Sequence, residues 1–493
     1  MREIRIIPEL ALVAALGVQI GMPLWRHLFV VHGIIDLPDG VRKLHRGAIP
    51  RAGGTAVMSA YVLSLMVLLM VEPSLRERLL QAAGPWMSVV SALLMIFAMG
   101  LVDDVFGLRP RYKLAVQVLA AAVAAVPTIV LTGPQPSLGF QCAKVGVAVF
   151  WLVLTTNAFN LIDGMDGLAS GLALIAAIAF GTAAMLQGSI LILLVLVPLA
   201  AALASYLRFN FHPASVFLGD SGSYSVGFLL GWSSLACSSK QVDTTAWALA
   251  SIMICALPVL DVFLAIWRRF LRARPLFAPD HGHLHHRLLA KGLGPCSSAL
   301  ILYVIATVYA VCAVMVVALP TLRIAAVSTA AVITLVMAGV LSHEEVAALG
   351  STLRHPVLRN ALATELAIRS AEASIRVARG REERWAALQA ASREMGFCSV
   401  QMEGPWGALE ARTHPKPVGS ACMETRCESC RRACATRVRL KDDIVILLYQ
   451  RIEQSPRANA LALAATLQRG WSAQPVFPAM TVSRSARQAA HMQ

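Results

Sequence analysis

The chain has 493 residues, of which 57% are hydrophobic and only 14% are charged, whereas soluble domains carry about 25% charged residues. This composition excludes an ordinary soluble protein and indicates an all-α polytopic membrane protein. Lys and Arg outnumber Asp and Glu by 43 to 28, but no segment resembles a nucleic-acid-binding module, so we expect a lipid bilayer and no nucleic acid as partner.

Long apolar segments follow one another from Pro8 to Leu341, and each is close to the ~20 residues that a helix needs to cross a bilayer. We expect about eleven transmembrane helices. Ten would also fit, because the sixth and seventh segments are separated by little more than Gln187 and Gly188. The segments are centred near Val18, Leu63, Ile96, Ala121, Phe150, Ala179, Val195, Leu229, Ile254, Ala310 and Val332.

Basic residues near the ends of these segments predict the orientation, because Lys and Arg are retained on the cytoplasmic side of the membrane. The loops after the first, third and ninth segments are the most basic. They contain Arg42, Lys43, Arg46 and Arg51, then Arg109, Arg111 and Lys113, then Arg268, Arg269, Arg272, Arg274, Arg287 and Lys291. Odd-numbered segments should therefore end on the cytoplasmic side, which also places the C-terminus there.

Five polar clusters interrupt the apolar pattern. They comprise residues 42–54, 103–104, 157–167, 217–222 and 281–286. Polar groups near a bilayer are costly to bury, about 2.5–3.5 kcal/mol for a central Asp on insertion scales, so they usually mark a site. All five clusters follow odd-numbered segments, so we expect them on one membrane face, where they can form one site.

The residue types in these clusters suit phosphoryl transfer. Its transition state spreads charge over phosphate oxygens, so catalysis consists mostly of positioning and cationic stabilisation. Asp side chains supply the hard oxygen ligands that Mg²⁺ prefers, and His and Lys donate hydrogen bonds to phosphate. Adjacent carboxylates such as Asp103 and Asp104 repel each other and are most easily retained beside a cation or a shared proton.

In these motifs the chain resembles the polyprenyl-phosphate N-acetylhexosamine-1-phosphate transferases, also called glycosyltransferase family 4. The match covers about residues 1–341, and the motifs read R-K-L-H-R-G-A-I-P-R-A-G-G, D-D, N-A-F-N-L-I-D-G-M-D-G-L, F-L-G-D-S-G-S and H-G-H-L-H-H-R-L. The resemblance implies an enzyme of the bacterial inner membrane whose active site faces the cytoplasm. Its members move a sugar 1-phosphate from a UDP-sugar to a lipid phosphate, usually undecaprenyl phosphate, and release UMP, with Mg²⁺ or Mn²⁺ as the metal.

Carried over position by position, the resemblance implies a role for each polar residue. Asp220 binds Mg²⁺, Asp103 engages the lipid phosphate, and Asp104 supports it. The catalytic set is completed by Asp163 and His285, and the substrate-binding set is Lys43, His45, Asn160, Asp166, His283 and His286. A direct attack by the lipid phosphate is the expected path, and a two-step path through a phosphorylated Asp stays open.

The histidine motif separates two branches of the family. The peptidoglycan branch transfers phospho-N-acetylmuramoyl-pentapeptide and typically has three consecutive histidines followed by Phe-Glu. The stretch H-L-H-H-R-L instead resembles the branch that uses UDP-N-acetylglucosamine, or a related UDP-N-acetylhexosamine, to initiate cell-surface polysaccharides such as lipopolysaccharide. His281 departs from that branch, which commonly has Arg or Lys there, and Gly107 stands where some members have a third acid.

Several of these residues also have structural explanations. Asp104 could cap the next helix, His212 is interpreted as an interfacial residue, and Asp261 either pairs with a polar neighbour or belongs to the site. Gly53 and Gly54 could serve close helix packing. The alternative for the whole chain is a transporter with an acidic ion pathway, although transporters place such groups near the bilayer midplane.

After Leu341 the charge rises and the apolar runs end. Helical and strand patterns predict a cytosolic α+β appendage over residues 342–456, with a regulatory role, followed by a disordered tail over residues 457–493. A C-x4-C-x2-C-x3-C pattern predicts a metal site in a reducing cytosol, with Zn²⁺ expected and an iron–sulfur cluster or free thiols as the alternatives. Its cysteines are Cys422, Cys427, Cys430 and Cys434. Whether the chain forms a homodimer stays open.

Overall fold

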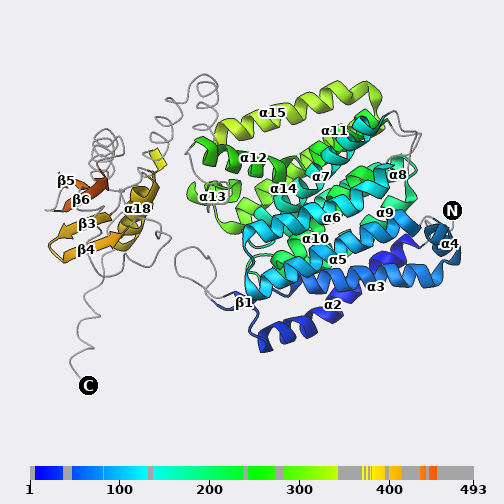
Figure 1. Ribbon diagram of the computed structural model, residues 1–493, viewed down its shortest axis with the longest axis horizontal. Coiled ribbons are helices and arrows are strands. Elements are labelled where there is room, and N and C mark those ends of the chain that lie inside the picture. Colours follow the sequence, from blue (N-terminus) through cyan, green and yellow to red (C-terminus); the bar gives the residue numbers. More distant parts are fainter. Residues whose placement is uncertain are drawn as a thin grey trace, which may run out of the picture. The chain divides into compact units, whose positions relative to one another are not determined.

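A computed structural model describes residues 6–36, 47–81, 83–130, 137–236, 243–271, 282–341, 380–394, 399–412, 433–439 and 444–451, with a few positions between 369 and 378. Backbone contacts divide the chain into two units. The first, the helical unit, contains residues 1–267 and 276–346, and the second, the C-terminal unit, contains residues 268–275 and 347–493. Figure 1 labels the elements of both.

The helical unit is a bundle of helices with one short hairpin (Figure 1). Strands β1 (Ile35–Asp36) and β2 (Ile49–Pro50) of the hairpin pair antiparallel. The helices are α2 (Ile7–Val31), α3 (Gly53–Val71), α4 (Pro73–Gln81), α5 (Ala83–Phe106), α6 (Pro110–Val130), α7 (Leu138–Leu161), α8 (Leu168–Leu186), α9 (Ile190–Asn210), α10 (Gly219–Ala236), α11 (Thr244–Ile254), α12 (Ala256–Leu271), α13 (Leu284–Ala290), α14 (Pro295–Ala318), the 3₁₀ turn η1 (Pro320–Leu322) and α15 (Arg323–Leu341).

Among the described residues, eight helices are long and apolar enough to cross a membrane, or nine if the bent pair α11–α12 is one span. The protein is therefore a mostly helical, multi-pass membrane protein, but the predicted count of eleven spans is not confirmed. Every predicted centre lies in a helix. The expected and observed counts differ because α6 and α10 are not among the helices counted as long and apolar enough. In addition, α11 ends at Ile254, where the chain turns by 66° into α12.

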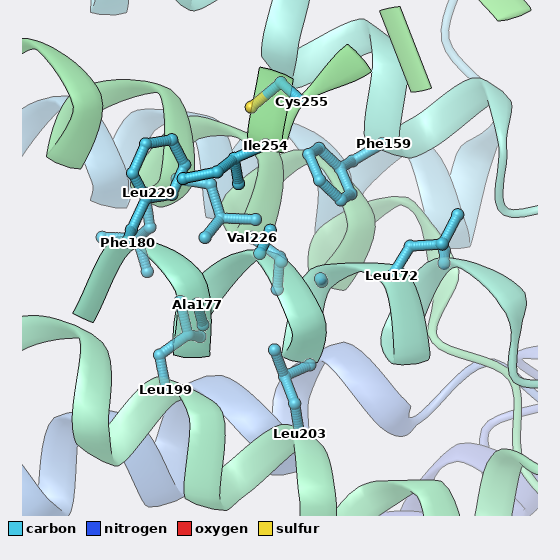
Figure 2. Close-up of a cluster of buried hydrophobic side chains, with 14 of the residues drawn as sticks. Phe159, Leu172, Ala177, Phe180, Leu199, Leu203, Val226, Leu229, Ile254 and Cys255 are labelled. Atoms are coloured by element: carbon cyan, nitrogen blue, oxygen red, sulfur yellow. The ribbon is translucent and has the colours of Figure 1, made fainter. Parts of the chain in front are cut away.

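The core of the bundle is built around α8 and α10. Between helices in lipid the hydrophobic driving force is small, so close packing of small side chains becomes the main attraction. Helix α8 buries a row of alanines, and the residues of α10 from Ser221 to Ser234 are all buried. Figure 2 shows how side chains from α7 to α11, and the residue after α11, meet there: Phe159, Leu172, Ala177, Phe180, Leu199, Leu203, Val226, Leu229, Ile254 and Cys255.

Glycines let the backbones of α3 and α5 approach the first turn of α10. A Cβ atom on Gly54 would lie 2.6 Å from Gly222 Cα, and one on Gly100 would lie 2.6 Å from the carbonyl oxygen of Asp220. The Gly54 amide also donates to Leu218 O at 2.7 Å. These contacts agree with the packing explanation for Gly54, and they fix the start of α10 against α3 and α5.

The C-terminal unit contains helix α18 (Arg381–Glu394) and a four-stranded antiparallel sheet. The strands are β3 (Ser399–Gly404), β4 (Gly407–Arg412), β5 (Ala433–Arg439) and β6 (Val445–Arg451), in the order β4-β3-β6-β5. Val400, Met402 and Ile446 of the sheet and Leu388 of α18 are buried. The limits and the regulatory role expected for this region stay predictions, and the tail from residue 457 onward lies outside the described residues.

Candidate active site

A cavity of about 780 Å³ in the helical unit takes lining residues from all five polar clusters. The hairpin, the last turn of α5, the loops after α7 and α9, helix α13 and the starts of α10 and α14 contribute to its wall. Its charged and titratable lining residues among those described are Asp36, Arg51, Asp104, Asp163, Asp166, His212, Asp220 and His286. Residues that are far apart in the sequence thus line one cavity.

Asp104 holds the first turn of α10, which carries Asp220. Its Oδ1 accepts a hydrogen bond from the Asp220 amide at 2.8 Å, and its Oδ2 accepts one from the Ser221 amide at 3.0 Å. Gly219 makes this approach feasible, because its φ is +75° and a Cβ there would lie 2.8 Å from Asp104 Oδ2. Asp104 is therefore a helix cap, but of α10 and not of the helix that follows it in the chain.

Lys113, on α6, links two of the predicted site residues. Its Nζ forms ion pairs with the carboxylates of Asp103 and Asp220, and it lies 3.1 Å from Asp220 Oδ2. On the other side, Asp220 Oδ1 accepts from Asn160 Nδ2 at 3.0 Å. Asp103, Asn160 and Asp220 were predicted from three separate motifs, and they form one network. In the sequence, Lys113 is identifiable only as a loop charge, since a basic residue near a span end carries no distinct signal.

The loop between α7 and α8 presents Asp163 and Asp166 to the cavity. Asp166 Oδ2 accepts from the Ala214 amide at 3.0 Å and lies 2.7 Å from His212 Nδ1. The interpretation of His212 as a merely interfacial residue is therefore incomplete, because it lines the cavity beside Asp166. Burial, followed by the charges of Asp220 and Asp104, raises the pKa of Asp163 to about 8.

Asp261, on α12, fixes the start of the histidine helix α13. Its Oδ2 lies 2.8 Å from His283 Nδ1, and its Oδ1 accepts from the Leu284 amide at 2.8 Å. Of the two explanations for Asp261, pairing with a polar neighbour is the one observed, and that neighbour is itself a predicted site residue. His283 does not line the cavity. Its ring instead stacks on His285, with centroids 5.9 Å apart.

His285 packs against the acidic loop. A Cβ on Gly164 would lie 2.6 Å from His285 Nε2, so the third and fifth motifs are in direct contact. Burial, followed by the charge of His286, lowers the pKa of His285 to about 3, which leaves this imidazole neutral. The ring centroid of His286 lies 4.2 Å from that of His285, and His286 lines the cavity. Lys43, His45 and His281 lie outside the described residues.

Two carboxylates offer oxygen ligands for a divalent metal. No group of three or more His, Cys, Asp or Glu side chains in metal-binding geometry occurs among the described residues. Mg²⁺ is usually held by one or two carboxylates together with substrate phosphates, and Asp103 and Asp220 already share the positive charge of Lys113. The donor set fits a Mg²⁺ ion completed by phosphate oxygens.

The predicted zinc site lies mostly outside the described residues. Cys422, Cys427 and Cys430 lie outside the described residues, and Cys434 is described only as a backbone position of β5, paired with Gln450. The Zn²⁺ site stays a prediction.

Comparison with known proteins identifies related sequences. Residues 86–238 match the profile of glycosyl transferase family 4. A probable undecaprenyl-phosphate N-acetylglucosaminyl 1-phosphate transferase of Bacillus subtilis is 32% identical over 321 residues, which are 64% of this chain and 85% of the relative. A decaprenyl-phosphate N-acetylglucosaminephosphotransferase of Mycolicibacterium smegmatis is 34% identical over 303 residues, 56% of this chain and 74% of the relative.

A third relative represents the other branch discussed above. A phospho-N-acetylmuramoyl-pentapeptide-transferase of Streptococcus thermophilus is 31% identical over 212 residues, which are 40% of this chain and 62% of the relative. The similarity to the N-acetylglucosamine enzymes thus extends over more of the chain.

Proposed function

The chain belongs to glycosyl transferase family 4, and on that premise we propose that it transfers N-acetylglucosamine 1-phosphate from UDP-N-acetylglucosamine to undecaprenyl phosphate and releases UMP. The product would be the lipid-linked initiator of a cell-surface polysaccharide. One observation carries the proposal: residues of all five polar clusters line a single cavity. A transporter does not require this gathering of donors and carboxylates at the ends of helices.

The acceptor phosphate belongs beside Asp103 and Lys113 in this proposal. The Lys113 ammonium, which pairs with the carboxylates of Asp103 and Asp220, would draw the lipid phosphate to the wall that carries Asp220. A phosphate monoester has a second pKa near 6, so much of it is dianionic at neutral pH. Asp103 therefore orients the acceptor, and it takes up a proton only when the phosphate arrives as a monoanion.

The reaction is a direct displacement at phosphorus. An oxygen of the lipid phosphate forms a bond to the phosphorus that bears the sugar, and the bond from that phosphorus to the bridging oxygen breaks. UMP leaves with that oxygen, and the sugar phosphate stays on the lipid as a diphosphate. Asp163, Asp166 and His286 line the cavity. In this proposal the two aspartates lie on the donor side and His286 donates a hydrogen bond to the diphosphate. His283 and the neutral His285 support His286.

Asp220, fixed by Asp104 and Asn160, is the proposed Mg²⁺ ligand. When bound, the metal would neutralise charge on the diphosphate. Lys43 and His45 are proposed to lie near the same phosphates, as the resemblance implies. The site and the C-terminus are proposed to face the cytoplasm of a bacterial inner membrane, where UDP-sugars are available.

The proposal is tested with purified protein in nanodiscs that contain undecaprenyl phosphate. UDP-N-acetylglucosamine, UDP-N-acetylgalactosamine and UDP-N-acetylmuramoyl-pentapeptide are supplied separately, with Mg²⁺ or with a chelator, and lipid-linked sugar and UMP are measured. We expect product with UDP-N-acetylglucosamine and Mg²⁺, and none for Asp220→Asn. The carboxyl-to-amide control Glu77→Gln, at an exposed residue of α4, should keep its activity. Product from the muramoyl donor alone would move the chain to the peptidoglycan branch.

A further inference from the structure

The described wall of the cavity has an unequal charge balance. Five carboxyl groups line it, Asp36, Asp104, Asp163, Asp166 and Asp220, and of these Asp163 keeps its proton at neutral pH. Arg51 is the one Lys or Arg among the described lining residues. A nucleoside diphosphate brings further negative charge into this space, so its binding depends strongly on the cations that reach it.

The backbone around Arg51 is fixed close to the start of α10. The Phe217 amide donates to Pro50 O at 2.9 Å, and the Arg51 amide donates to Ile34 O at 3.4 Å. The carbonyl oxygen of Arg51 is so close to Gly219 that a Cβ there would lie 3.1 Å from it. Arg51 thus follows strand β2 directly, and its backbone lies against the turn that carries Asp220.

Asp36 determines how the guanidinium group is held. Arg51 Nη2 donates to Asp36 Oδ1 at 2.5 Å, and the Asp36 side chain is 9% exposed while that of Arg51 is 37% exposed. Of the residues that the structure describes, Asp36 is the one that forms a hydrogen bond and ion pair with this guanidinium, through one nitrogen. A guanidinium has five N–H groups in a planar fork that matches phosphate oxygens, so it keeps donors for an anion.

The charge of Arg51 is also secure. Burial alone would lower the pKa of Arg51, but the hydrogen bond and charge of Asp36, with the charges of Asp104 and Asp220, raise it. The group is therefore a fixed cation in a wall of carboxylates.

We propose that Arg51 binds the diphosphate of the nucleotide donor with its free N–H groups and that Asp36 is the positioning residue that holds the guanidinium at the cavity wall. The inference rests on the proposed function for the identity of the donor. It adds to that function a residue that selects donors with two phosphates over those with one or none.

The test compares the binding of uridine, UMP and UDP to the purified full-length protein by equilibrium dialysis with labelled ligands, in the presence of Mg²⁺. Charge-assisted hydrogen bonds of about 1.5–3 kcal/mol correspond to roughly 10-fold to 150-fold in affinity. We expect Arg51→Gln to weaken UDP binding by about 10-fold or more, UMP binding by less, and uridine binding by less than about two-fold. Arg51→Lys should fall between, because it keeps the charge and loses the fork.

Two further variants complete the comparison. Asp36→Asn should weaken UDP binding by less than Arg51→Gln does, and it should not affect uridine. Arg208→Gln, an exposed arginine on α9 that does not line the cavity, is the matched control and should bind all three ligands normally. Unchanged uridine binding shows that each variant is folded.

Two results would overturn the inference. Equal weakening of uridine and UDP by Arg51→Gln would mean that Arg51 only supports the hairpin, and unchanged UDP binding would mean that it does not contact the diphosphate. The failure of the proposed function is a separate outcome, in which the wild-type protein makes no lipid-linked product while UDP binding still depends on Arg51. In active protein, Arg51→Gln should raise the KM for UDP-N-acetylglucosamine and leave the KM for undecaprenyl phosphate unchanged.

Discussion

The Asp104→Asn variant separates a residue that positions the metal ligand from one that contacts substrate. Asp104 accepts two amide hydrogen bonds from the first turn of α10, at 2.8 and 3.0 Å. Asparagine keeps one acceptor oxygen and replaces the other by an amide nitrogen, so one charge-assisted hydrogen bond is lost. Such a bond contributes about 1.5–3 kcal/mol, which corresponds to roughly 10-fold to 150-fold in an equilibrium.

We expect this loss to act on Asp220, the residue that Asp104 holds in place. The apparent affinity for Mg²⁺ should fall by about the factor just given, and high Mg²⁺ should restore much of the rate. The measurement is kcat as a function of Mg²⁺ in nanodiscs, with the wild type and Glu77→Gln as the comparisons. An Asp104→Asn protein that is folded but inactive at every Mg²⁺ concentration would refute a positioning role, and so would one with unchanged Mg²⁺ dependence.

Three further predictions concern the pH response, the packing and the C-terminal unit. Asp163 has a pKa of about 8 in the folded protein against 3.8 for an ordinary Asp, so the folded state keeps a proton that the unfolded state has released, and stability should fall as pH rises from about 4 to 8. The metal-free Asp163→Asn variant should therefore gain about 1 kcal/mol or more in stability relative to the wild type between pH 5 and 8.5. This gain is measured as a difference in Tm that rises with pH, and a constant difference would contradict this assignment. Gly54→Ala should abolish product formation, because the added Cβ would lie 2.6 Å from Gly222 Cα and displace the start of α10, while Gly146→Ala, with open space around it, should stay active in the same assay. Truncation after Leu341 should leave measurable transferase activity, because every described residue that lines the cavity lies between Asp36 and Pro295; complete inactivity of a normally inserted protein would assign the C-terminal unit an essential role.

Hydropathy located the helices well because each needs a long apolar segment. The number of spans is harder to predict from hydropathy, and α10 shows why. This helix is enclosed by other helices and contains buried serines such as Ser221 and Ser225. Ser225 Oγ donates to Ser221 O at 2.7 Å. A helix that is covered by protein can carry polar groups that a lipid-facing helix cannot. Composition alone therefore does not show whether such a helix spans the membrane.

The gathering of the five clusters could be predicted from their common position after odd-numbered segments. The partners within the site could not. Asp104 caps a helix that begins more than a hundred residues later, and Lys113 contacts Asp220 across 107 positions. Such pairings depend on which helices become neighbours, and a single sequence does not contain that information. Arg51 and Lys113 have the same appearance in the sequence as any basic residue that orients a membrane helix.

The most direct test of the account follows the phosphate that bears the sugar. UDP-N-acetylglucosamine labelled with ³²P in that phosphate is incubated with the purified protein, Mg²⁺ and undecaprenyl phosphate, and the label is traced between the lipid and the nucleotide. The account predicts that the label moves to the lipid together with the sugar, with one UMP released for each product molecule. Label that stays with the nucleotide as UDP, while the sugar moves, would contradict transfer at phosphorus and with it the role given to this cavity.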